Sequence, residues 1–312
     1  MQANVQILLA TYNGEQFLQQ QIESLLQQTY TDFSILIRDD GSTDKTLEII
    51  ESYQQKYPAK FILLKEDKKN VGATQNFGIL LAHSTADYIF FCDQDDVWMP
   101  SKIEQSLNAI FTIENEQKMN PCLVYSDMKL INEHGIIIAD SVWKQLHLSP
   151  DYFTLNRLLV QNIPHGCTVL INKAMKSIAS PIPATAILHD HWLALLAASI
   201  GNSVAITTPL LLLRNHTQNV TRKNYSFAEK IKRYFKNLSD KNAYEHSLKI
   251  RIAQAKALME KCSLQLNNDQ IRLLQDFIAL ENMGSMQRKK IFIKNQFYRT
   301  TFLHSLKMIL RA

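Results

Sequence analysis

Three carboxylates stand within four residues in the segment Asp93–Asp96, where Gln94 is the neutral member. The segment follows the apolar run 88–92, which predicts a buried strand. Like charges this close repel one another, and the arrangement is costly unless a cation neutralises it. Mg²⁺ and Mn²⁺ prefer oxygen ligands and usually also bind substrate phosphates. The segment therefore predicts a divalent metal site. The alternative is an acidic loop that caps the helix expected after Pro100.

Two further polar turns follow apolar runs near the start of the chain. Thr11, Tyr12 and Asn13 come after the run 5–10, and the turn 39–42 comes after the run 33–37. A carboxylate such as Asp40 can accept hydrogen bonds from the base or the ribose of a nucleotide. The alternative is a pair of ordinary turns, the second of which ends in the N-cap of a helix.

Asp190 stands at the start of an apolar helical run, between His189 and His191. A carboxylate in such a place can have its pKa raised, as a general base requires, and the alternative is a helix cap flanked by surface histidines. A zinc site is disfavoured, because residues i and i+2 do not share a helix face. His216 follows an apolar strand and is a candidate ligand of a metal or a phosphate. The alternative is an ordinary loop histidine.

The elements that must position these residues alternate between strand and helix over the first hundred residues. Strands are predicted at 5–10, 33–37, 61–64 and 88–92, with a helical pattern after each of the first three. This order predicts parallel strands with right-handed crossovers. Ligands of such sheets bind at the carboxyl ends of the strands, and all three polar segments fall there. Later strands are expected at 123–125, 130–131, 168–171 and 210–213, and helices from Tyr225 onward.

Composition places the 312 residues among globular proteins with a substantial core, because 46% are hydrophobic and 20% are charged. Eight Gly and eight Pro exclude collagen-like and low-complexity chains. The four cysteines show no CxxC spacing, so we expect neither a disulfide framework nor a thiolate zinc site, and a reducing cytoplasmic location fits best. We expect no signal peptide and no membrane span, because no apolar stretch approaches about 18 residues.

Charge divides the chain into an acidic body and a basic tail. Residues 222–312 contain 19 Lys/Arg and seven Asp/Glu, and residues 1–221 carry a net charge of −7. We therefore expect a domain at 1–221 and a basic, amphipathic helical extension at 222–312. Basic and apolar residues interleave at helical spacing over 227–238 and 287–311, which favours contact with an anionic membrane surface. Packing on the body, contact between copies of the chain and nucleic-acid binding are the alternatives.

Six segments taken together resemble the family 2 glycosyltransferases, which are inverting sugar transferases with the GT-A fold. The segments are Leu9–Gly14, Ile22–Tyr30, Arg38–Asp44, Asn70–Gly72, Phe91–Lys102 and His189–Trp192. The resemblance covers about residues 4–221. It implies an α/β fold with a Rossmann-like mixed sheet flanked by helices, followed by the C-terminal helical extension. The acidic motif and the downstream Arg214, His216 and Asn219 are similar to the rhamnosyltransferase-like branch, although Leu213 stands where that branch usually has Tyr.

The resemblance also implies a role for each candidate residue. The residues that would bind the donor nucleotide are Thr11, Tyr12, Asn13, Asp40 and Asp93. The residues that would hold Mn²⁺ or Mg²⁺ are Asp93, Asp95 and His216. Asp190 would be the catalytic base that deprotonates the acceptor. The residues that would shape the acceptor and sugar pocket are Trp98, Gly166 and Trp192.

The implied reaction moves a sugar, L-rhamnose from dTDP-L-rhamnose, to a hydroxyl of a lipid-linked or saccharide acceptor in surface-polysaccharide synthesis (O-antigen, capsule or cell wall). One direct displacement would invert the anomeric centre. The implied enzyme is cytoplasmic and peripheral on the inner face of the plasma membrane, with no nucleic-acid partner. A UDP-sugar donor and a non-catalytic nucleotide-sugar-binding module are the alternatives. A haloacid dehalogenase-like phosphatase is disfavoured, because its Asp-x-Asp follows the first strand of the domain.

Overall fold

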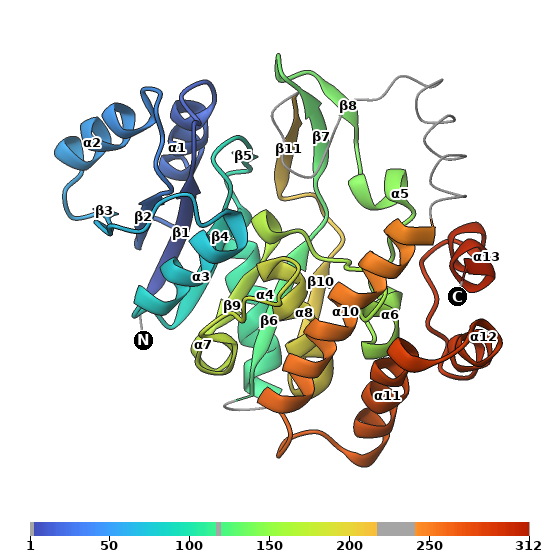
Figure 1. The fold of residues 1–312 in the computed structure, drawn as a ribbon. Helices are drawn as coiled ribbons and strands as arrows, with labels where there is room; N and C mark the ends of the chain where they lie inside the picture. The colour runs from blue at the N-terminus through green and yellow to red at the C-terminus, as the bar shows by residue number, and fades with distance from the viewer. Residues whose placement is uncertain (1–2, 117–119, 217–240, 312) are drawn as a thin grey trace.

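The computed structural model describes residues 3–116, 120–216 and 241–311, and the strands in these ranges form two sheets (Figure 1). The larger sheet has seven strands in the order β10-β6-β9-β4-β1-β2-β3. Their bounds are β1 Val5–Thr11, β2 Phe33–Asp39, β3 Phe61–Leu63, β4 Tyr88–Cys92, β6 Cys122–Ser126, β9 Leu170–Asn172 and β10 Asn202–Ile206. β9 runs antiparallel to β4 and β6, whereas the other neighbours are parallel. The sheet is therefore mixed, as the family resemblance implied.

The smaller sheet has four strands in the order β5-β11-β7-β8. Their bounds are β5 Val97–Trp98, β7 Lys129–Asn132, β8 Ile137–Ala139 and β11 Leu211–Asn215. β11 pairs antiparallel with β5, which directly follows the acidic segment 93–96. This pairing carries the residues at the end of β11 back to the acidic segment. Neither β5, which has only two residues, nor β8 was predicted from the sequence.

Helices cover both faces of the larger sheet (Figure 1). The helices up to residue 200 are α1 Leu18–Leu26, α2 Thr46–Lys56, α3 Ala73–His83, α4 Lys102–Glu116, α5 Val142–Leu146, α6 Leu155–Leu158, α7 Lys173–Ala179 and α8 His189–Ile200. Neighbouring strand residues point to opposite faces, so Leu8 and Phe91 belong to one core and Ile7 and Phe90 to the other. The first core is covered by α3, α7 and α8, and the second by α1, α2 and α4.

The C-terminal helices are α10 Lys241–Lys261, α11 Asn268–Ala279, α12 Ser285–Lys294 and α13 Phe302–Arg311. Leu248, Ile252 and Leu258 of α10 are buried in the same core as Trp192 of α8. At least α10 and α11 therefore pack on the body, which was one of the alternatives for the basic tail. The expected division after residue 221, the amphipathic pattern 227–238 and Asn219 lie outside the described residues.

The strands predicted at 5–10, 33–37, 61–64 and 88–92 are confirmed, with ends that agree to within two residues. The strand predicted at 168–171 is wrong at its start, because residues Gly166–Thr168 form a 3₁₀ turn and β9 begins at Leu170. The N–H and the hydroxyl of Thr168 both donate to the carbonyl oxygen of His165, and these bonds hold the turn. Within the described ranges, none of the helices has the length and apolar character needed to cross a membrane.

Candidate active site

The turns after β1 and β2 are fixed against each other. Thr11 and Asp39 are partners in the register of the two strands, and Thr11 Oγ1 donates to Asp39 Oδ1 at 3.0 Å. The backbone N–H groups of Gly41 and Ser42 donate to the other oxygen of Asp39. Asn13, in the left-handed region at φ 48°, donates its N–H to Ser42 Oγ at 2.8 Å. These bonds hold the predicted nucleotide-binding turns at the carboxyl edge of the sheet.

Gln94 connects the first turn to the acidic segment, a role that the sequence did not predict. Its Nε2 donates to the carbonyl oxygen of Tyr12 at 2.9 Å, and its Oε1 accepts from the N–H of Tyr12 at 2.8 Å. A Cβ on Gly14 would lie 2.3 Å from Gln94 Oε1, so a larger residue here would displace the Gln94 amide from Tyr12. Tyr12 remains 49% exposed. An exposed aromatic ring at this edge is suited to stack on a nucleobase.

Asp40 is buried, and both of its oxygens accept hydrogen bonds within the protein. Arg38 Nη1 donates to Oδ1 at 3.0 Å, and the N–H groups of Val71 and Gly72 donate at 3.0 Å and 2.9 Å. Asp40 therefore holds the turn 70–72 against the end of β2. A direct contact of Asp40 with a nucleotide stays a prediction.

His216 contacts the acidic segment, and its role as a metal ligand stays a prediction. Its Nε2 lies 2.7 Å from Asp95 Oδ2, and its ring packs against Phe17 with 4.8 Å between ring centroids. Arg214 of β11 also holds the acidic segment in place. Its backbone N–H donates to Asp96 Oδ1 at 3.0 Å, and its Nε donates to the carbonyl oxygen of Asp95 at 2.9 Å.

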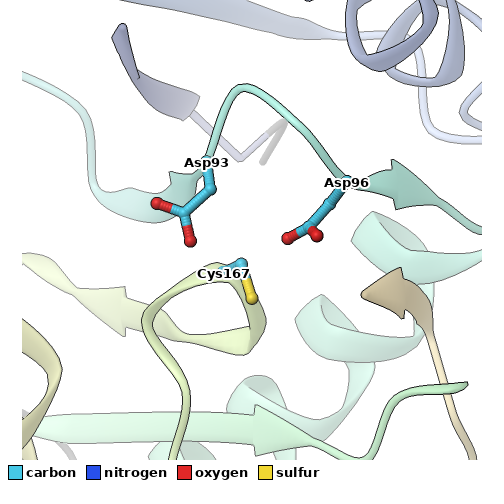
Figure 2. Close-up of side chains that lie close together, drawn as sticks. All are labelled: Asp93, Asp96 and Cys167. Carbon is cyan, nitrogen blue, oxygen red and sulfur yellow. The ribbon is translucent and has the colours of Figure 1, made fainter. Parts of the chain in front are cut away.

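Figure 2 shows Asp93 and Asp96 at the two ends of the acidic loop, with Cys167 facing them from the 3₁₀ turn. Ligand atoms of these three residues all lie within 4.8 Å of one another. Burial, followed by the charges of Asp96, Asp95 and Asp190, raises the pKa of Asp93 well above its usual value. Burial and Asp95 raise the pKa of Asp96 to about 7. Burial and the neighbouring carboxylates therefore disfavour the ionised forms of Asp93 and Asp96.

This donor set fits a divalent cation. Asp96 Oδ2 is buried and has no hydrogen-bond partner among the residues that the structure describes. Carboxylate oxygens suit Mn²⁺ and Mg²⁺, and a neighbouring imidazole suits Mn²⁺ better than Mg²⁺. Burial raises the pKa of Cys167, and its sulfur is a soft donor that suits Mn²⁺ and Mg²⁺ poorly. The donor atoms that the structure brings together are those of Asp93 and Asp96, with the Asp95–His216 pair beside them. The ligand set Asp93, Asp95 and His216 stays a prediction.

Lys102 is a buried cation beneath this loop, for which no role was predicted from the sequence. Its Nζ lies 4.5 Å from the ring centroid of Trp98 and 5.5 Å from that of Phe90. Burial lowers the pKa of Lys102 to about 8, and the charge of Asp96 acts in the opposite direction. An ammonium in this place partly offsets the loop's negative charge.

Asp190 lies in the first turn of α8 and faces the turn that carries Cys167. Its Oδ2 accepts from the N–H of Gly166 at 2.9 Å, and its Oδ1 accepts from the N–H of His191 at 2.6 Å. Burial raises the pKa of Asp190 to about 7, although these N–H bonds act to lower it. Its charge also raises the pKa of Asp93. The structure therefore brings the candidate base close to the candidate metal site.

The three residues predicted to shape the pocket lie in different surroundings. Gly166 contacts both Asp190 and the ring of His189, and a Cβ there would lie 2.4 Å from His189 Nε2. Trp192 needs correction, because it is fully buried in the core and its indole N–H donates to the carbonyl oxygen of Ala179. Trp98 is 2% exposed beneath the acidic loop, so it supports the loop from inside and does not form a wall open to solvent.

Comparison with known proteins identifies the fold and the family. The profile of Glycosyl transferase family 2 matches residues 6–175. The solved structure of S. aureus TarS 1–349 with UDP-GlcNAc aligns with a TM-score of 0.58 at 14% identity, over 89% of this chain and 71% of that one. The chain therefore belongs to glycosyl transferase family 2, and it is a nucleotide-sugar glycosyltransferase with the GT-A fold.

Two curated relatives extend the similarity beyond the fold. The dTDP-rhamnosyl transferase RfbG of Shigella flexneri is 32% identical over 240 residues, which are 72% of this chain and 77% of RfbG. The UDP-Glc:alpha-D-GlcNAc-diphosphoundecaprenol beta-1,3-glucosyltransferase WfgD of Escherichia coli is 27% identical over 55% of this chain and 61% of its own length. Asp190 and His216 lie beyond the segment that the family profile matches. Their assignment therefore depends on the geometry described above.

Proposed function

We propose that this enzyme transfers a sugar with inversion from a nucleoside-diphosphate donor to a hydroxyl of a surface-polysaccharide precursor. One observation carries the proposal: Asp190, whose pKa is raised to about 7, lies close enough to Asp93 to raise the pKa of that carboxyl too. Activation of the acceptor hydroxyl requires a base whose pKa is near neutral pH. Departure of the diphosphate requires a cation beside that base, and the acidic loop would bind this cation.

The proposed donor is dTDP-L-rhamnose, and the similarity to RfbG supports it. A UDP-sugar is the alternative, supported by the similarity to WfgD and by the fold shared with TarS. In either case the nucleotide would lie along the turns that carry Thr11, Tyr12 and Asn13, with Asp40 and Asp93 beside it. The exposed ring of Tyr12 would stack on the base.

Asp93, Asp95 and His216 would hold Mn²⁺ or Mg²⁺. When bound, the cation supplies positive charge that stabilises the negative charge developing on the leaving diphosphate. Gln94 and Arg214 keep the acidic loop in place through their backbone contacts, so the carboxylates are oriented before the donor binds.

Asp190 would take the proton of the acceptor hydroxyl as that oxygen attacks the anomeric carbon from the face opposite the diphosphate. The new glycosidic bond forms as the bond to the diphosphate breaks, and a single displacement inverts the anomeric configuration. Gly166 and His191 each donate a backbone N–H to one oxygen of Asp190. Each carboxylate oxygen offers about two lone pairs, so Asp190 keeps a site for the acceptor proton.

The proposed acceptor is linked to a lipid, and the enzyme would dock on the anionic inner face of the plasma membrane. Apolar side chains of α12 and α13 support this, because Met286, Ile293, Leu303 and Leu310 are all more than half exposed. Lys290 is exposed on α12 between Met286 and Ile293. Exposed apolar residues beside Lys and Arg are typical of helices that lie on anionic membranes.

The test is a panel of dTDP-, UDP- and GDP-sugars with Mn²⁺ or Mg²⁺. Melting temperature and slow donor hydrolysis are measured for the wild type and for Asp95→Ala. A metal-dependent shift with one donor, lost in the variant, would support the proposal and identify the donor. Donor binding without hydrolysis or transfer to any polyprenyl-diphosphate saccharide would favour the non-catalytic binding module instead.

A further inference from the structure

Gln254 of α10 contacts one residue before and one residue after Asp190 in the chain. Its Oε1 accepts from the N–H of Ile187 at 2.8 Å, and its Nε2 lies 3.3 Å from Nδ1 of His191. The other ring nitrogen of His191, Nε2, lies 2.6 Å from the carbonyl oxygen of Leu158. Gln254 and His191 are only 1% and 2% exposed, so water does not compete for these bonds.

The nature of the partners fixes the direction of each of these bonds. The carbonyl oxygen of Leu158 can only accept, so Nε2 of His191 carries the hydrogen. Nδ1 of His191 then presents a lone pair, to which the amide N–H of Gln254 donates. The amide oxygen of Gln254 is left to accept from Ile187, as observed. One tautomer of His191 and one orientation of the Gln254 amide therefore satisfy all three contacts.

The charges around this network favour a neutral imidazole. Burial, followed by the charge of Arg251 on α10, lowers the pKa of His191 to about 4. On the other side of Asp190, the acidic loop contributes the carboxyl of Asp93, and the loop between α6 and β9 contributes the uncharged amide of Asn162. A neutral His191 adds no positive charge beside Asp190, and so leaves the raised pKa of that carboxyl in place.

The start of α8 needs such support. Leu188, the residue before the helix, provides no side-chain cap. The segment 187–191 is held instead from α10 through Gln254 and from α6 through the carbonyl oxygen of Leu158. A shift of this segment would move Asp190, and misplacement of a reacting group by about 1 Å can slow a reaction about a hundredfold.

We propose that Gln254 and His191 are positioning residues that hold Asp190 for the reaction, so that α10 is a working part of the active site. The inference rests on the proposed function in one respect, namely that Asp190 is the base. It assigns the C-terminal helical region a task that is separate from any contact with a membrane.

The first experiment compares Gln254→Met with Gln270→Met. Gln270 of α11 donates to the carbonyl oxygen of Ser199 at 2.6 Å, near the opposite end of α8, so it is a matched glutamine without contact to the segment 187–191. Turnover of dTDP-L-rhamnose or of the donor found in the panel is measured with Mn²⁺. We expect kcat to fall about tenfold to a hundredfold in Gln254→Met, with the donor KM within about twofold, and kcat to be kept in Gln270→Met. Equal kcat values in the two variants would overturn the inference.

The second experiment probes the hydrogen bonds of His191 and Gln254 directly and does not depend on turnover. Nitrogen NMR of labelled histidines in the wild type should show His191 as the Nε2–H tautomer across about pH 6 to 8, and an Nδ1–H tautomer would overturn the inference. Gln254→Glu has nearly the same shape but presents a carboxylate to Nδ1, and we expect it to raise the pKa of His191. Full kcat in Asp190→Asn, together with the expected spectra, would show that Asp190 is not the base. The hydrogen-bond network of Gln254 and His191 would still be confirmed in that case.

Discussion

Nε2 of His216 lies 2.7 Å from Oδ2 of Asp95, although 120 residues separate them in the chain. The antiparallel pairing of β11 with β5 brings them together, and Arg214 fixes the pairing through its bonds to Asp95 and Asp96. A carboxylate and an imidazole that already face each other form a preorganised pair of ligands. The loop of three carboxylates alone would be held open by its own repulsion.

We therefore expect His216→Ala to weaken metal binding rather than donor recognition. The Mn²⁺ concentration for half-maximal activity should rise about tenfold to a hundredfold, as is common when a group that binds or orients a metal ligand is lost. Titration of Mn²⁺ by calorimetry or by its paramagnetic resonance spectrum measures this directly. His134→Ala is the control, because His134 is an exposed turn residue and should leave the titration unchanged. Unchanged Mn²⁺ affinity in His216→Ala would show that this residue is not a ligand.

The raised pKa of Asp190 predicts the pH dependence of the reaction. A base acts in its deprotonated form, so kcat/KM should fall about tenfold per pH unit as the pH drops below about 7 and should level off above it. Asp190→Asn should lower kcat by about 10² to 10⁴ and should remove this acidic limb from the residual rate. Rates measured from about pH 5.5 to 8.5 test both statements. An acidic limb that persists in Asp190→Asn would belong to another group.

The same pKa has a consequence for stability. Asp190 binds its proton more tightly in the folded chain than in the unfolded one, because burial raises its pKa from 3.8 to about 7. The folded state thus bears a cost that grows as the pH rises from about 4 to 7 and is fully present above about 7. We expect the melting temperature of Asp190→Asn at about pH 8 to equal or exceed that of the wild type. A marked loss of stability would show that the carboxylate is structurally required.

Gly166 provides a test of the space beside the candidate base. A Cβ at this position would lie 2.4 Å from Nε2 of His189, whose ring is packed between Phe77 and Phe91 and cannot move freely. We expect Gly166→Ala to lower the free energy of unfolding by about 1 to 3 kcal/mol and to reduce kcat, because its N–H orients Asp190. Gly284→Ala is the control, because a Cβ there would meet nothing within 4 Å. Equal denaturant midpoints for the two variants would contradict the packing described here.

Local patterns were enough to predict the edge of the sheet where the candidate residues gather. Apolar runs followed by polar turns place Thr11, Asp39 and Asp93 at strand ends, and the parallel order of these strands then brings the turns together. Contacts that depend on how helices pack on the sheet could not be predicted from such local patterns. Neither the core position of Trp192 nor the bond from Gln254 to the start of α8 has a local signal, because each depends on which helix covers which face of the sheet.

The exposed apolar residues of α13 predict how the enzyme binds to membranes. Leu303 and Leu310 are 67% and 65% exposed, on a helix that follows the basic helix α12. Burying such side chains in a membrane stabilises binding by roughly 1.5 to 3 kcal/mol each, and charge attraction to anionic lipids adds to this. Leu303→Glu with Leu310→Glu should therefore reduce flotation with phosphatidylglycerol vesicles at least tenfold and leave donor turnover unchanged. Leu264→Glu is the control, because Leu264 is 95% exposed in the turn after α10, outside α12 and α13. No flotation of the wild type with phosphatidylglycerol vesicles, or equal flotation with phosphatidylcholine vesicles, would exclude docking on an anionic membrane by these helices.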